Sequence, residues 1–157
     1  MKSSICDLLG IEFPLVAFSH CRDVVAAVSR AGGMGVFGAG ALSPARLEEE
    51  LAWIDEHIDG KPYGVDLLIP DHMAGKHAAF SEEHELAAVP TDHKEFADEI
   101  LARHGIDPTD LDNERRARLQ IGRNLRETGA AELLAVAFRH PIRLIANALG
   151  VPPEIML

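Results

Sequence analysis

Short apolar runs alternate with longer amphipathic stretches in the first part of the chain. Apolar runs of strand length cover Ile11–Phe18, Met34–Phe37 and Tyr63–Ile69, with few polar side chains in them. Between these runs, apolar residues recur at helical spacing over Val24–Ala31 and Ser43–Ile58. Strands that are apolar throughout are typical of parallel sheets whose faces are covered by helices. The pattern therefore predicts β-α-β-α-β units in an α/β fold.

The helix predictions include a cap and a buried face. Ser43 followed by Pro44 predicts the start of the second helix, because serine caps helices and proline suits the first helical position. The glycine pair Gly32-Gly33 predicts a turn before the second strand. The residues predicted to be buried on the first of these helices are Val24, Val25, Val28 and Ala31.

The regular pattern is interrupted after the third strand. Residues 71–128 are poorer in apolar side chains, and they are predicted to form a helical insertion, or lid, lying over the end of the sheet. Helices are expected within it over Thr91–His104 and Glu114–Arg126. A further helix, Gly129–Arg139 with Thr128 as its cap, leads to a fourth apolar strand over Pro141–Ala148. The chain is accordingly expected to form a single domain, residues 1–157.

The charge balance disfavours nucleic acid as a partner. The 157 residues carry 25 acidic and 15 basic side chains, a net charge of −10. Nucleic-acid binding needs a basic surface that displaces counterions from phosphates. The one arginine-rich stretch is interpreted as a solvated helix face, and it comprises Arg115, Arg116, Arg118, Arg123 and Arg126.

Cysteine and histidine usage narrows the chemistry further. With only Cys6 and Cys21, a disulfide framework is not expected and a reducing cytoplasm is the simplest localisation. No leader-like segment or apolar run of membrane-spanning length is seen, so no membrane partner is predicted. The histidines at 72, 77, 84 and 93 do not have the spacing of a known ligand pattern, so no metal site is predicted.

Particular stretches of the chain carry a family resemblance. They read ICDLLGIEFP at 5–14, AAVSRAGGMGVFGAG at 26–40, LSP at 42–44 and KPYGVDLLIP at 61–70. Together they resemble the nitronate monooxygenases, once called 2-nitropropane dioxygenases. The resemblance covers the first seventy residues well and the fourth strand loosely. It distinguishes this family less sharply from the flavin-type enoyl reductases, which remain an alternative.

The resemblance implies an FMN-binding (β/α)8 barrel, or TIM barrel. In that family an alkyl nitronate is oxidised with oxygen to a carbonyl compound and nitrite, so the implied partners are a nitronate and oxygen. A complete barrel needs about 250 residues. The chain is therefore expected to supply the first half of the barrel, with the insertion after its third strand, and to be inactive without the second half.

The resemblance also implies where the flavin lies, across the carboxyl ends of the strands. The predicted cofactor contacts are Phe18, Ser19, His20, Gly38, Asp66 and Asn147. His20 stands where the family usually has methionine, and Asp66 where it commonly has asparagine. A carboxylate there would repel an anionic reduced flavin unless it were protonated or paired. The family's catalytic histidine and phosphate-binding loops fall beyond Leu157, so no catalytic residue is predicted in this chain.

Plainer interpretations of the same residues stay open. His20 is also explained as a histidine that bonds a backbone carbonyl in the turn after the first strand. Asp66 is also explained as a cap for the following loop, and Asn147 as a polar residue that closes a strand. For the whole chain, the alternative is a non-catalytic half-barrel that associates with itself or pairs with a second half-barrel.

Overall fold

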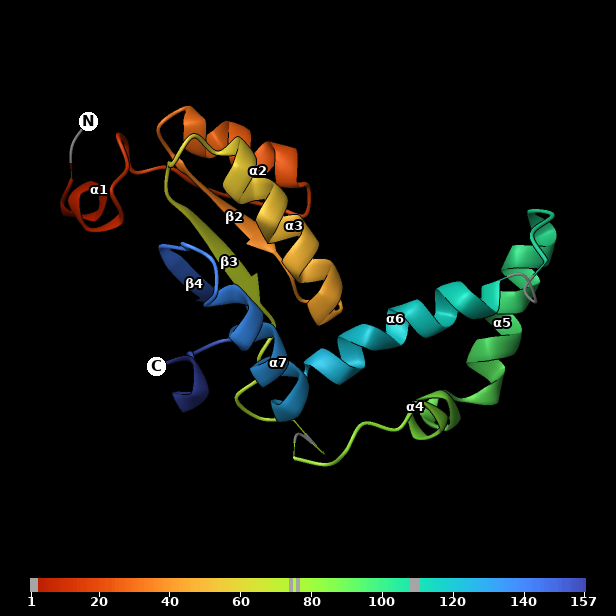
Figure 1. Ribbon diagram of the computed structural model, residues 1–157. Helices are drawn as coiled ribbons and strands as arrows, with labels where there is room; N and C mark the ends of the chain where they lie inside the picture. The colour runs from red at the N-terminus through yellow and green to blue at the C-terminus, as the bar shows by residue number, and fades with distance from the viewer. Residues whose placement is uncertain (1–2, 74, 76, 108–110) are drawn as a thin grey trace.

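A parallel sheet forms the centre of the computed structural model, which describes residues 3–73, 75, 77–107 and 111–157, with side chains left undescribed at 112–117. Its strands lie side by side in chain order (Figure 1). They are β1 (Val16–Ser19), β2 (Met34–Gly38), β3 (Tyr63–Leu67) and β4 (Leu144–Asn147). All three neighbouring pairs are parallel. The α/β fold with parallel (β/α) units, as in the first half of a TIM barrel, is therefore confirmed.

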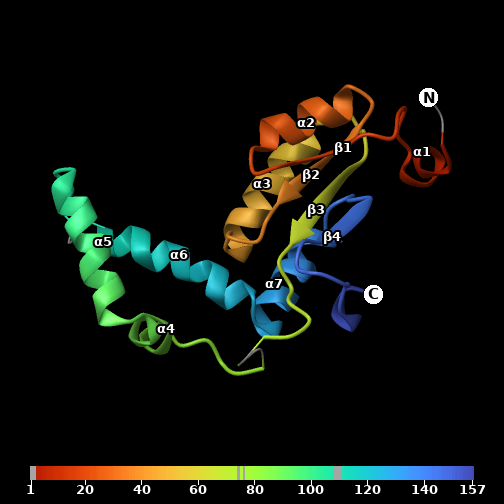
Figure 2. The ribbon, with the colours of Figure 1, turned by 180° about the vertical axis from the view of Figure 1, so that it is seen from behind.

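Helices cover one face of this sheet. They are α2 (Arg22–Arg30), α3 (Pro44–His57) and α7 (Glu127–Ala137), and they lie on the same side of the strands in Figures 1 and 2. The main core lies between them and the sheet, where Leu47, Leu51 and Leu133 pack with Phe37 and Val65, each at most 2% exposed. Burial of these side chains supplies much of the folding free energy.

The opposite face of the sheet is covered only at its amino end. There α1 (Ser4–Leu9) contributes Cys6 and Leu9 to a small cluster with Met34 and Val36. Nearer the carboxyl end of β1, Phe18 is 56% exposed. This face is therefore open where the strands end, and a short 3-10 helix, η2 (Glu154–Met156), follows β4.

The segment after β3 is helical, as predicted, but most of it projects away from the sheet instead of lying over its end (Figures 1 and 2). It contains α4 (Glu82–Ala88), α5 (Thr91–Arg103) and α6 (Asp112–Asn124). Both ribbon views show α4 and α5 extending to one side, with α6 returning to α7 (Figures 1 and 2). Neither α4 nor α5 buries a side chain. Of the described residues of these three helices, only those in the carboxyl half of α6 lie near the sheet. Helix α6 is therefore the part of this insertion that can shape a site.

The predicted face of α2 was right for Val25, which is fully buried, and wrong for Val24 and Ala31. Val24 is 43% exposed and Ala31 is exposed, whereas Ala26 and Ser29 are buried. The reason is close packing on β2: Ser29 Oγ accepts a 2.9 Å hydrogen bond from the Gly35 N–H. A Cβ added at Gly35 would lie 2.3 Å from the Val25 carbonyl oxygen. Helix and strand are too close for larger side chains between them.

Two other local predictions had opposite outcomes. Ser43 is the N-cap of α3, and its Oγ accepts a 3.2 Å hydrogen bond from the Arg46 N–H, as predicted. Thr128 is not a cap, because α7 begins one residue earlier, at Glu127. The first strand begins at Val16 rather than Ile11, because Ile11 packs against α1 instead of joining the sheet.

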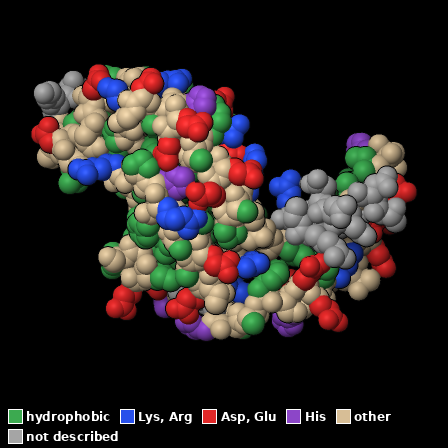
Figure 3. Space-filling view, viewed as in Figure 1, with side chains coloured by type: hydrophobic (Ala, Val, Ile, Leu, Met, Phe, Trp, Pro, Cys, Tyr) green, Lys and Arg blue, Asp and Glu red, His purple; other side chains and the backbone are tan. Residues whose placement is uncertain are grey.

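No described helix is both long enough and apolar enough to cross a membrane. On the face shown in Figure 3, Asp and Glu side chains are spread over the body of the molecule, with Lys and Arg side chains between them. This mixed distribution agrees with the acidic net charge of the sequence.

Candidate functional site

A cavity of about 690 Å³ lies on the open face of the sheet, toward the carboxyl ends of the strands. Every strand contributes a side chain or backbone surface to its lining, including Phe18, Gly38, Asp66 and Ala146. Register explains this convergence, because Gly38 pairs with Asp66, and Asp66 pairs with Ala146. The volume falls in the range of small-molecule and cofactor sites, roughly 300–1,000 Å³.

Gly38 gives this cavity its shape. A Cβ at this position would lie 2.6 Å from Phe18 Cζ and 2.7 Å from His20 Nδ1. Because glycine has no side chain, the two rings of β1 can lie against the end of β2. The Phe18 and His20 rings meet edge to face, with centroids 4.9 Å apart.

His20 is held by the backbone and also lines the cavity. Its Nδ1 lies 3.1 Å from the Gly38 carbonyl oxygen. Because a carbonyl oxygen only accepts, Nδ1 must carry the proton, and a neutral ring then has Nε2 as an acceptor. The carbonyl contact and a ligand contact are therefore compatible, and each can use a different nitrogen.

Asp66 is the only carboxylate among the described residues that line the cavity, and it is 7% exposed. Burial raises the pKa of Asp66, while the nearby His20 and the Ala148 N–H act in the opposite direction. Burial is the largest of these causes, because an apolar environment disfavours the charged form. Asp66 therefore retains its proton to a higher pH than an exposed aspartate does.

Ser19 and Asn147 are placed differently from the other predicted contacts. Ser19 Oγ accepts a 3.0 Å hydrogen bond from the Cys21 N–H in the turn after β1. Asn147 binds both backbone groups of Ile69, with its Oδ1 3.0 Å from the nitrogen and its Nδ2 2.9 Å from the oxygen. Neither side chain lines the cavity. The structure thus brings Phe18, His20, Gly38 and Asp66 together at the cavity. That any of them contacts a cofactor stays a prediction.

Helix α6 adds site residues that the sequence analysis missed. Arg118 and Ile121 line the cavity. Farther along α6, the buried Asn124 donates from Nδ2 to the carbonyl oxygens of Gly40, at 3.0 Å, and Leu42, at 2.8 Å. The sequence predicted a helix here, over Glu114–Arg126, with a solvated arginine face, but nothing in it shows that α6 returns to the sheet.

The interpretation of the arginines as an exposed face was right for Arg118 and Arg123 and wrong for Arg126. Arg123 is exposed and pairs with Glu132 at 2.9 Å. Arg126 has a side chain only 10% exposed, and it binds Glu85 and the Gly75 carbonyl. The side chains of Arg115 and Arg116 lie outside the described residues.

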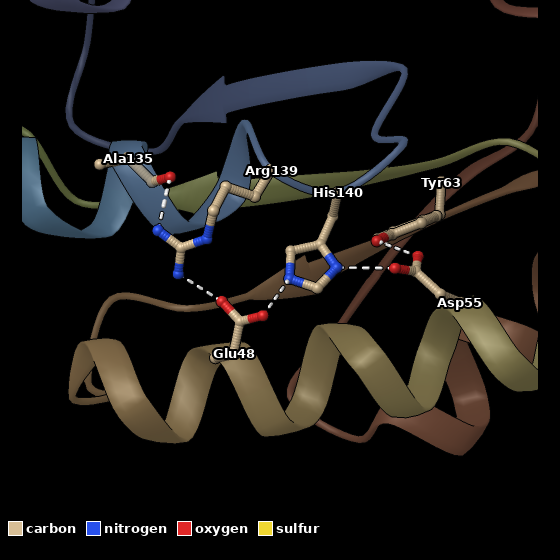
Figure 4. A network of polar contacts seen from close by, with 6 residues as sticks. All are labelled: Glu48, Asp55, Tyr63, Ala135, Arg139 and His140. Carbon is tan, nitrogen blue, oxygen red and sulfur yellow. Dashed lines mark hydrogen bonds and ion pairs between the residues drawn. The ribbon is translucent and has the colours of Figure 1, made fainter.

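A second polar cluster lies on the helix-covered side, away from the cavity (Figure 4). His140 Nδ1 is 2.6 Å from Asp55 Oδ2, and the Tyr63 hydroxyl donates to Asp55 Oδ1 at 2.7 Å. Glu48 contacts both His140 and Arg139. Burial, with the Asp55 contact, raises the pKa of Tyr63. These bonds connect α3 with β3 and with the end of α7, so the cluster supports the frame of the site.

Metal binding has no support in the part of the chain that the structure describes, where no group of three or more His, Cys, Asp or Glu side chains is arranged to hold an ion. Of the histidines in the insertion, His77 instead pairs with Glu127 at 2.7 Å. The cavity on the open face is therefore the site to compare with those of related proteins.

This chain is similar in sequence to several known proteins. The protein named "Putative monooxygenase Rv1533" of Mycobacterium tuberculosis is 50% identical over 154 residues, which are 98% of this chain and 40% of that protein. The "Probable nitronate monooxygenase" of Staphylococcus saprophyticus is 38% identical over 74 residues, 45% of this chain and 21% of that protein. The Staphylococcus haemolyticus protein of the same name is 34% identical over 77 residues, with 46% and 21% covered.

The chain spans 40% of the length of the first of these relatives and 21% of the other two. The profile of the nitronate monooxygenase family matches residues 2–107, which include β1, β2 and β3 with the cavity residues that they carry. Because this match covers more than half of the chain, the protein belongs to the nitronate monooxygenase family.

Proposed function

We propose that this chain forms the amino-terminal wall of an FMN-dependent oxidoreductase that oxidises alkyl nitronates with oxygen to carbonyl compounds and nitrite. One observation carries the proposal: the cavity at the carboxyl ends of the strands, in a member of this family. Ligands of parallel α/β folds bind at that edge of the sheet. The rest of the site would come from the part of the barrel that this chain does not span.

The cavity has features that suit the ring system of FMN, the cofactor of this family. Its lining is mostly apolar, and polar groups are supplied by His20 and Asp66. The missing Cβ at Gly38 lets the Phe18 and His20 rings approach β2. Phe18, His20 and the Gly38 backbone would hold the flavin ring. When bound, FMN would supply electron transfer between the nitronate and oxygen.

The residues of this chain would orient the ligand and control its protons. His20 keeps its Nδ1 proton on the Gly38 carbonyl, so Nε2 is left to accept a hydrogen bond from a ligand. The pKa of Asp66 is raised by burial, which would lessen the repulsion between its carboxyl group and an anionic ring. Phe18 would exclude water from this side of the ligand.

The decisive experiment is the visible spectrum of the purified chain on a sizing column after incubation with FMN. Co-elution of the flavin band with the protein is expected, and Gly38→Ala should reduce it, because the added Cβ meets Phe18 and His20. Release of nitrite from ethylnitronate is then measured with the chain alone and with a full-length relative. A wild-type chain that elutes without flavin would show that the rest of the barrel is needed to hold FMN, and a full-length relative that binds no FMN would contradict the cofactor assignment. Reduction of bound flavin by NADH or NADPH would favour an enoyl-reductase activity.

A non-catalytic, self-associating half-barrel is the second candidate, and exposed apolar side chains favour it. Val16 is 52% exposed and Phe18 56% exposed on the open face. In addition, β1 and β4 are the edge strands of the sheet, and such edges invite pairing with another chain. Light scattering at micromolar concentration is expected to show a dimer, and a monomer would contradict this candidate.

A further inference from the structure

Helix α6 forms one wall of the cavity and is hydrogen-bonded to the loop after β2. Asn124, 2% exposed, holds the carbonyl oxygens of Gly40 and Leu42 in the loop after β2, and Gly40 itself lines the cavity. Ile121 and Arg118 precede Asn124 by three and six residues, so each of these side chains lies next to the following one on the surface of the helix, and Ile121 and Arg118 both line the cavity. The bonds of Asn124 therefore fix where Ile121 and Arg118 stand relative to the strands.

The cavity does not share the excess of acidic side chains found in the chain as a whole. The chain has a net charge of −10, yet the titratable residues that line the cavity are His20, Asp66 and Arg118. Arginine keeps its charge at all ordinary pH values. Among the described residues of the lining, Arg118 is therefore the one that is cationic at every ordinary pH, and Asp66 is the one with a carboxyl group.

The surroundings of Arg118 suit an anionic ligand. In the described part of the chain, no carboxylate forms an ion pair with Arg118, whereas Arg123, in the next turn of the same helix, pairs with Glu132. Arg118 is exposed, so it lies where the cavity opens to solvent. A guanidinium group in this position can bind carboxylate-like oxygens through two parallel hydrogen bonds.

We propose that Arg118 binds the anionic oxygens of the substrate and so makes the cavity selective for anions, an inference that rests on the proposed nitronate oxidation. A nitronate carries its negative charge on two oxygens attached to one nitrogen, a geometry that matches the fork of a guanidinium group. Arg118 is thus a substrate-binding and specificity-determining residue contributed by the insertion. Asn124 is the positioning residue that holds α6, and therefore Arg118, at the cavity.

The test uses ligand binding, so it does not depend on a working flavoenzyme. Ethylnitronate and its neutral counterpart nitroethane are titrated into the 157-residue chain, and binding is followed by NMR through the arginine Nε–H signals and by calorimetry. The variants are Arg118→Gln and Arg118→Lys. The control is Arg123→Gln, which removes the same charge from the same helix outside the cavity. FMN is titrated into each protein in a parallel series.

Arg118→Gln is expected to weaken ethylnitronate binding by about 10- to 100-fold, as for loss of a charge-assisted hydrogen bond. Arg118→Lys should recover part of that loss, Arg123→Gln should stay within about 2-fold of wild type, and nitroethane binding should not distinguish the proteins. Added salt should weaken ethylnitronate binding to wild type more than to Arg118→Gln.

Several results would overturn the proposal. These are no binding of millimolar ethylnitronate to wild type, equal affinities in wild type and Arg118→Gln, or equal losses in the Arg118→Gln and Arg123→Gln variants. A loss of FMN binding alone in Arg118→Gln would assign the guanidinium to the cofactor phosphate instead. If Arg118 selects ethylnitronate while neither this chain nor a full-length relative binds FMN, the proposed function fails and the assignment of Arg118 stands.

Discussion

The two faces of the four-stranded sheet consist of alternate residues of the same strands, but they are covered differently. On the helix-covered face, Phe37 is 2% exposed and Val65 is fully buried. On the open face, Val16 and Phe18 are 52% and 56% exposed. Burial of apolar area on the helix-covered face stabilises the fold, whereas the open face leaves room for a ligand. Stability and binding are therefore expected to respond to different substitutions.

The largest stability effect is expected from the core of the helix-covered face. Leu51 of α3 is fully buried, and Leu51→Ala should lower the free energy of unfolding by about 3 kcal/mol, because it leaves a cavity. Phe18→Ala, on the open face, should cost less than about 1 kcal/mol and instead weaken FMN binding. Urea unfolding and flavin titration of both variants test the contrast. A loss of stability in Phe18→Ala as large as that in Leu51→Ala would contradict it.

A second test uses two glycines of β2 that face opposite sides. Gly35→Ala should destabilise the protein by about 2 kcal/mol, because the new Cβ would meet the Val25 backbone, which cannot easily move. Gly38→Ala should cost less, since its Cβ meets only the rings of Phe18 and His20, but it should obstruct the cavity. Thermal unfolding and FMN titration distinguish them, with Gly122→Ala as the control. There a Cβ finds ordinary contact distances, the nearest 3.5 Å from Phe80.

The polar cluster on the helix-covered side predicts a smaller effect. Asp55→Asn should lower the free energy of unfolding by about 1.5 kcal/mol, because it weakens the bonds to His140 and Tyr63. Tyr63→Phe removes only one of these bonds and should cost about 1 kcal/mol. Denaturant unfolding gives both values, and FMN binding serves as the control, since the cluster lies away from the cavity. Impaired FMN binding with unchanged stability would show that the two faces are coupled.

The smallest effect concerns the pH dependence contributed by Asp66. Its pKa in the folded chain is raised above the ordinary value of 3.8, mainly by burial. Its contribution to stability is therefore full below pH 3.8 and is lost as the pH rises through the folded pKa. Relative to Asp66→Asn, the wild type should lose stability over that interval and not above it. Unfolding free energies measured from pH 3 to 8 check this sign, and the opposite slope would show a lowered pKa.

Most of the sheet could be predicted because each strand is a run of apolar residues with a glycine or proline boundary. The face of α2 could not be predicted from apolar spacing, because Gly35 brings the backbones so close that small side chains, Ala26 and Ser29, occupy the contact. The apolar side chain of Val24 is instead exposed to solvent. Apolar spacing predicts a buried face only where the helix and strand are far enough apart for large side chains.

The alternation of side chains along a strand could predict which strand residues face the cavity. Phe18 and His20 lie two residues apart and share a side of β1, whereas Ser19 between them faces the other way. For the same reason Asn147 faces the opposite side of the sheet from Asp66, because it is Ala146 that pairs with Asp66. The contributions of Arg118 and Asn124 depend on the path of the insertion, which local sequence patterns do not encode.

The long connection between β3 and β4 also bears on the order in which the sheet assembles. The strands β2 and β3 are joined by 24 residues, and β3 and β4 by 76. Closing the longer loop costs about 1 kcal/mol more in chain entropy, and pairing between distant segments is slow to form. The pairing of β4 is therefore expected to be the last in folding, and until it forms β3 is an unprotected edge at which a misfolded or swapped partner can add.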